Sequence, residues 1–252
     1  MSELNFLDTG GNKQKITTPA VNSMAFNTAN TERVRIDSNG DITVGAGGDL
    51  KMSSTGRIFL GDGGNATDPM FANISDTNTG LFYPSADQLA FTTGGSERLR
   101  INNYGLVTRP FQYHLHADRS GTLTGYDAGG SFGTPMVFNR IVSETKDSSL
   151  SSCFNTSNGL FTAPVTGVYL FNAAVYSGSG NIFGQSWFTL NGSRCNATDW
   201  VINGNYSFIQ NFQQIRLAAG NTVGFKPYAS GQSNVQIYEN ANHTYFKVSL
   251  IG

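Results

Sequence analysis

Short segments of alternating apolar and polar residues run along the whole chain. In residues 33–36, for example, Val34 and Ile36 fall on one side of an extended strand and the two arginines on the other. Gly, Asn, Asp and Ser separate the segments, and no stretch of about 12 residues carries apolar positions at helical spacing. The pattern therefore predicts an all-β chain.

The pattern of the N-terminal half is repeated after 65 residues. Residues 24–42 align without gaps with residues 89–107, and both copies carry Ala-Phe, then Glu-Arg-x-Arg-Ile, then a glycine. Residues 52–58 form a partial third copy. The Asn39-Gly40 pair suits the positive φ of a tight turn, so each copy predicts strand, turn and strand. Because such a unit cannot bury its apolar face alone, it predicts packing against further repeats or other copies of the chain.

Residues 76–101 carry three strings in a fixed order: D-T-N-T-G-L-F-Y-P, D-Q-L-A-F and S-E-R-L-R-I. These strings resemble a recurrent module of bacteriophage tail-fibre proteins, and the resemblance covers about residues 20–110. It implies an elongated, trimeric, β-rich segment of a virion fibre.

The C-terminal half carries a different signature. Residues 158–171 read N-G-L-F-T-A-P-V-T-G-V-Y-L-F, which predicts two strands separated by a proline that cannot donate to a sheet. The string resembles the signature of the heads of complement component one q and of tumour-necrosis-factor-like proteins, and the resemblance covers residues 111–252. It implies a ten-stranded jelly-roll β-sandwich that forms homotrimers. The matching positions are Gly159, Phe161, Pro164, Gly167, Tyr169, Phe171, Gly192, Gly220 and Phe246.

Residues 206–217 carry apolar side chains on both sides of a predicted strand. Phe208 and Phe212 fall on one side, and Ile209, Ile215 and Leu217 on the other. This is more apolar surface than one face of a sandwich usually hides, which favours a trimer interface. A strand buried on both faces within one subunit would give the same pattern.

Together these features predict three parts: a virion attachment segment (residues 1–20), a β-repeat shaft (21–110) and a jelly-roll head (111–252). The chain carries 16 basic and 17 acidic residues, so we expect no binding to nucleic acid. The longest apolar run is too short to span a bilayer, so we expect no membrane insertion.

The sequence contains no nucleophile elbow, phosphate-binding loop or zinc-protease helix, so we expect no enzymatic activity. Cys153 and Cys195 could pair or remain free thiols. His114 and His116 fall on one face of a strand, and in a trimer six imidazoles could surround one transition metal on the axis. The alternative is a pair of surface or interface histidines without metal. No other cofactor is predicted.

Receptor contacts are expected on loops at the end of the head away from its termini. Counting strands places these loops at about residues 143–148, 177–184, 202–206 and 229–242. Amide side chains suit hydrogen bonds to sugar hydroxyls, and aromatic rings suit stacking on sugars. The candidates of these types on or beside the loops are Asn181, Phe183, Asn203, Asn205, Tyr206, Tyr228, Gln232 and Tyr238. The alternative is that they are ordinary turn residues.

The sequence thus predicts a trimeric bacteriophage tail-fibre protein that recognises a host-surface receptor, a glycan in our interpretation. Its N-terminus would dock on tail or baseplate proteins, and it would reside in the virion after synthesis in the host cytoplasm. Two alternatives remain at this point: a head fibre or decoration protein with a structural role only, and a polysaccharide depolymerase tailspike.

Overall fold

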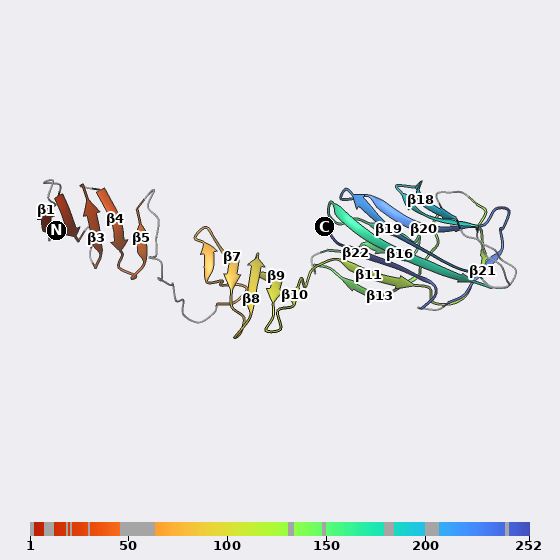
Figure 1. The fold of residues 1–252 in the computed structure, drawn as a ribbon, viewed down its shortest axis with the longest axis horizontal. Coiled ribbons are helices and arrows are strands. Elements are labelled where there is room, and N and C mark those ends of the chain that lie inside the picture. Colours follow the sequence, from red (N-terminus) through yellow and green to blue (C-terminus); the bar gives the residue numbers. More distant parts are fainter. Residues whose placement is uncertain are drawn as a thin grey trace. The chain divides into compact units, whose positions relative to one another are not determined.

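A computed structural model describes residues 3–7, 13–18, 20, 22–29, 31–45, 64–130, 134–147, 150–178, 184–199, 207–239 and 242–252. Throughout these ranges the regular elements are β-strands, which confirms the predicted all-β class (Figure 1). No helix in the described ranges is long and apolar enough to cross a membrane. The chain divides into two compact units, Met1–Gly61 and Asp62–Gly252.

The first unit contains one antiparallel five-stranded sheet with its strands in chain order. The strands are β1 (Glu3–Leu7), β2 (Lys13–Thr17), β3 (Met24–Thr28), β4 (Thr31–Ile36) and β5 (Ile42–Val44). Residues 1–20, predicted as an attachment segment, therefore supply the first two strands of this sheet.

The second unit begins with a sheet of the same design. Its strands are β6 (Phe71–Asn73), β7 (Asp76–Phe82), β8 (Leu89–Thr93), β9 (Ser96–Ile101) and β10 (Val107–Thr108). Phe26 pairs with Val34 in the first sheet, and Phe91 pairs with Leu99 in the second. A register shift follows the phenylalanine in both sheets. The repeated sequence therefore forms the same hairpin twice.

The structural repeat begins earlier than the sequence repeat. Ile16 on β2 pairs with Phe26, and Leu81 on β7, again 65 residues later, pairs with Phe91. The division after Gly61 falls inside the predicted repeat region, so the two copies belong to different units. The partial third copy at residues 52–58 lies outside the described residues.

The remainder of the second unit is a jelly-roll β-sandwich, as predicted (Figure 1). A seven-stranded sheet has the order β12-β21-β16-β22-β11-β13, and β19 pairs with the other edge of β16. Its strands are β11 (His114–Asp118), β12 (Leu123–Tyr126), β13 (Arg140–Thr145), β16 (Gly167–Ser177), β19 (Ser207–Leu217), β21 (Val235–Ile237) and β22 (Tyr245–Leu250). A five-stranded sheet has the order β14-β15-β20-β17-β18. Its strands are β14 (Phe154–Asn155), β15 (Leu160–Thr162), β17 (Gln185–Leu190), β18 (Ser193–Asp199) and β20 (Thr222–Tyr228).

Aromatic side chains of the sequence signature form the centre of the core between these sheets. Phe161 lies 5.4 Å from Tyr169 and 5.7 Å from Phe171, measured between ring centroids, and all three are fully buried. The Tyr169 hydroxyl donates to the Val165 carbonyl at 2.8 Å, which satisfies its buried polar atom. The aromatic residues of the jelly-roll signature therefore pack the core of the sandwich.

Both chain ends of the sandwich lie at one end of it. The Leu250 amide donates to the Tyr113 carbonyl at 3.0 Å, and the Val168 amide donates to the Gly252 carbonyl. We call this the proximal end and the opposite one the distal end. Strand β16 starts at the proximal end, so its last residue, Ser177, lies at the distal end. Residues 179–183 of the predicted distal loop 177–184 lie outside the described residues.

The predicted distal position of loop 143–148 is wrong. Strand β13 is antiparallel to β11, and Thr145 lies opposite His114, so β13 returns the chain to the proximal end. The physical reason is that β11 runs from the proximal to the distal end and β13, after the connection 119–139, runs back beside it. That connection, which follows the distal end of β11, joins the distal loops instead.

Candidate functional site

An apolar row crosses the first sheet from edge to edge. Cross-strand pairing aligns five side chains on one face: Leu4, Ile16, Phe26, Val34 and Val44. Phe26 keeps 39% of its surface exposed, and Leu4 and Val44 are also exposed. The sheet has one layer, so the described part of this unit leaves the row uncovered.

The second sheet carries the same row. Phe71, Leu81, Phe91 and Leu99 lie opposite one another across four strands. Phe91 is 42% exposed, close to the value of its counterpart in the first sheet. Exposed apolar surface that recurs at equivalent positions of two sheets indicates an interaction surface.

Strand β19 forms an edge of the seven-stranded sheet and carries two exposed aromatic residues. Phe208 is 43% and Phe212 57% exposed, whereas Ile209, Ile215 and Leu217 are buried. The alternation expected of a strand therefore sends one set into the core and the other outward. This excludes the alternative in which the strand is buried on both faces within one subunit.

Polar side chains lie next to these phenylalanines on the outer face of the seven-stranded sheet. Gln210 donates to Asn172 Oδ1 and to the Tyr245 hydroxyl, both at 2.8 Å. Lys247 lies across β16 from Phe212, since both pair with Asn172. The outer face of the seven-stranded sheet thus combines aromatic rings with amides, as a protein interface does.

His114 and His116 lie on this same outer face, because Leu115 and Ala117 between them are in the core. His114 Nδ1 lies 3.0 Å from Ser249 Oγ, and the His116 ring packs edge-on against Tyr245 at 6.4 Å. The described residues contain no cluster of three or more potential metal ligands. A metal ion on these histidines would therefore need ligands from further copies of the chain.

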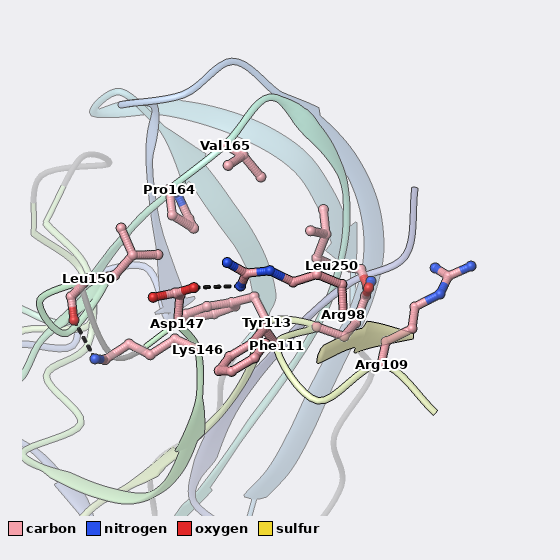
Figure 2. Close-up of a pocket in the computed structure, with 11 residues that line it drawn as sticks. Arg98, Arg109, Phe111, Tyr113, Lys146, Asp147, Leu150, Pro164, Val165 and Leu250 are labelled. Carbon is pink, nitrogen blue, oxygen red and sulfur yellow. Dashed lines mark hydrogen bonds and ion pairs between the residues drawn. The ribbon is translucent and has the colours of Figure 1, made fainter. Parts of the chain in front are cut away.

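A cavity of about 320 Å³ lies where the second sheet meets the proximal end of the sandwich (Figure 2). Arg98, from β9, forms an ion pair with Asp147 at 2.6 Å, and its Cζ lies 4.9 Å from the centre of the Phe111 ring. Lys146 donates to the Leu150 carbonyl beside it. The cavity therefore lies at the contact between the second repeat sheet and the head.

Three of the predicted receptor residues are described, and the two tyrosines among them pack against other aromatic rings of the head. Tyr228 lies 5.1 Å from Trp187, and Tyr238 lies 5.7 Å from Tyr176, between ring centroids. Gln232 is exposed on the turn after Ala229. The other five, Asn181, Phe183, Asn203, Asn205 and Tyr206, lie outside the described residues.

The two cysteines are free thiols in this structure, and both are half-buried. Burial raises the pKa of the Cys153 thiol, and the nearby Glu144 carboxylate raises it further. The Cys195 pKa is also raised by burial. A thiol with a raised pKa carries less of the reactive thiolate at neutral pH.

No protein-family model and no curated protein matches this chain. Solved structures similar to part of it include the globular domain of zebrafish complement 1qA, with 19% identity and a TM-score of 0.38, over 56% of this chain and 98% of that one. Murine APRIL is 11% identical with a TM-score of 0.38, over 56% of this chain and 99% of that one. Eiger TNF from S. frugiperda is 13% identical with a TM-score of 0.38, over 57% and 94%.

Proposed function

We propose that this chain is a trimeric bacteriophage fibre protein whose jelly-roll head attaches the virion to a host-surface glycan. The observation that supports it most is the apolar row, exposed on both one-layer repeat sheets at equivalent positions. A sheet that is apolar on one face and has only one layer needs a partner to be stable.

Copies of the same chain are the partner that fits the repeat. Fully burying a phenylalanine contributes about 1.5–3 kcal/mol, so covering the exposed two-fifths of Phe26 and of Phe91 contributes about 0.6–1.2 kcal/mol each, and the other side chains of the rows add to this. Three copies of a repeat sheet that face a common axis would enclose the row of that sheet. The exposed Phe208 and Phe212 on the edge strand of the head offer apolar surface for the same kind of contact.

The remaining parts of the proposal follow from this arrangement. The N-terminal sheet would dock on tail or baseplate proteins, and the distal loops of the head would face the host. Attachment would use binding without catalysis, because three weak contacts on one trimer give high avidity.

The first test is the solution mass of the whole chain by light scattering. One chain has a mass of 27.1 kDa, so a trimer gives about 81 kDa and supports the proposal. A mass of one chain at all concentrations overturns it. The second test is binding of the labelled whole chain to susceptible cells, with inhibition of infection as the functional readout.

A further inference from the structure

The turn between β9 and β10 has the same geometry as its counterpart in the first sheet. The Asn102 side-chain oxygen accepts hydrogen bonds from the amides two and four residues later, both at 3.0 Å. The Asp37 side chain accepts from the equivalent two amides at 2.8 Å and 3.0 Å. A glycine with positive φ lies in each turn, Gly40 at +88° and Gly105 at +77°. The same turn therefore forms in both copies of the repeat.

The side chains carried by the two turns differ. Tyr104 takes the place of Asn39 in the first copy and is 81% exposed. Leu106 takes the place of Asp41 and is 61% exposed. Because the first copy builds this turn with polar residues, the turn itself does not require an aromatic ring or an aliphatic side chain. Apolar side chains that gather in solvent without a role in folding indicate a binding partner.

A second exposed tyrosine lies at the same end of the second sheet. Neighbouring strands are antiparallel, so the loop between β7 and β8 and the turn between β9 and β10 lie at one end of it (Figure 1). Tyr83, in that loop, is 44% exposed, and its counterpart in the first copy is the exposed Thr18. The two connections are centred two strand spacings apart, or about 10 Å. We call Tyr83, Tyr104 and Leu106 the aromatic end of the second sheet.

The charge of the turns differs as well. The turn of the first copy carries two carboxylates, those of Asp37 and Asp41. Asn102 and Leu106 take their places in the second copy, and the exposed Asn103 adds a second amide beside the ring. The second turn thus combines two amides with an aromatic ring and carries no charge.

This combination fits a sugar chain better than a protein. Side-chain amides donate to and accept from hydroxyl groups, and a tyrosine ring offers a flat apolar face to the C–H groups of a sugar. The spacing of the two connections matches the length of a disaccharide. A stable protein interface covers about 800 Å² on each partner, which is more than three side chains supply.

We propose that the aromatic end binds a neutral segment of a glycan, with one sugar on each tyrosine ring. The exposed Asp87, in the same loop as Tyr83, would accept from a hydroxyl and would repel an acidic sugar. The inference rests on the proposed function and deepens it, because it adds a glycan site on the second repeat sheet to the contacts of the head. None of the receptor residues expected from the sequence lies in this sheet.

The test measures binding of the labelled whole chain to susceptible cells. The double substitution Tyr83→Thr and Tyr104→Asn introduces the residues that the first copy carries, so both connections should fold as before. We expect the apparent affinity to fall about tenfold while the mass from light scattering stays unchanged. Ile74→Thr is the matched control, because Ile74 is 95% exposed but lies in the β6–β7 turn at the opposite end of the sheet.

Three results would overturn the site. They are equal binding of the double variant and the unsubstituted chain, an equal loss in Ile74→Thr, and a loss of affinity that accompanies a lower mass. The last result would show that the tyrosines hold copies of the chain together.

Treatment of the cells identifies the class of partner. Mild periodate cleaves the vicinal diols of sugars, whereas protease removes exposed proteins. The part of the binding that depends on Tyr83 and Tyr104 should disappear after periodate and survive protease. The reverse result overturns the glycan and assigns the aromatic end to a protein partner.

The outcomes separate this inference from the proposed function. A chain that binds susceptible cells equally well with and without the two tyrosines overturns the aromatic end as a site and leaves the attachment function standing. A chain that binds no susceptible cells overturns the attachment function, and this inference with it.

Discussion

Residues at equivalent positions of the repeat make different contacts in the two copies. Arg33 and Arg98 occupy equivalent positions, and each donates from Nε to a threonine five residues earlier, at 2.8 Å and 3.0 Å. Arg98 also reaches Asp147 at 2.6 Å and stacks on Phe111. The arginine of the second copy therefore ties the repeat sheet to the head.

We expect Arg98→Ala to loosen this joint. The variant loses a partly exposed ion pair and a cation–π contact, each worth about 0.5–1 kcal/mol. Hydrogen exchange at the amides of residues 111–113 should become faster. Arg33→Ala removes the equivalent side chain of the first copy and is the control. Equal exchange rates in the two variants would contradict the assignment.

The cysteine thiols should react slowly in the folded chain. Their raised pKa leaves less thiolate at pH 8, so alkylation by iodoacetamide should be slower than in the urea-unfolded chain. The folded-state rate should continue to rise at pH values where the unfolded chain has reached its plateau. Cys153→Ser assigns the remaining reaction to Cys195. A plateau at the same pH in both states would argue against the raised values.

At the scale of elements, tight approach of backbone segments explains why the jelly-roll signature carries a glycine at residue 159. Gly159 has a φ of +71° between β14 and β15, and a Cβ built on it would lie 2.1 Å from the Met136 carbonyl oxygen. The Met136 amide in turn donates to the Phe225 carbonyl at 2.7 Å. Gly159 thus lets the segment before β13 pack against β20 and the β14–β15 turn.

We expect Gly159→Ala to destabilise the head more than Gly192→Ala does. Gly192 also has a positive φ, +81°, but open space surrounds its Cβ position. The backbone conformation alone costs about 1–2 kcal/mol in both variants, and Gly159→Ala adds the displacement of the Met136 carbonyl. Urea unfolding of the whole chain measures both. Equal losses would show that the contact with Met136 is unimportant.

At the scale of the whole molecule, apolar surface that one chain leaves exposed should hold the assembly together. Phe208 and Phe212 face outward from the edge strand β19, and because about half of each is exposed, covering each contributes about 0.7–1.5 kcal/mol. The double substitution of both by serine should raise the chain concentration at which the trimer dissociates by more than about tenfold.

Light scattering over a dilution series measures this effect. Tyr104→Ser is the control, because Tyr104 is also a large exposed side chain, at 81%, but lies in the turn before β10. A mass unchanged by the Phe208 and Phe212 substitutions, or an equal effect of Tyr104→Ser, would remove β19 from the interface.

Much of the local structure was predictable from the sequence. The alternation, the turn glycines and the 65-residue repeat led to the two hairpins, whose register then proved identical. The pairing of consecutive strands depends on side chains a few residues apart, so the local sequence pattern predicts it. The aromatic signature likewise predicted the core at Phe161 and Phe171.

The sequence by itself determined the β class, the repeat and the faces on which apolar side chains gather. Only the tertiary structure decided which end the loop after β13 occupies and which partner Arg98 finds. These features join segments far apart in the chain, such as residues 98 and 147. Their positions follow from how the strands cross between two sheets, which no local alternation records.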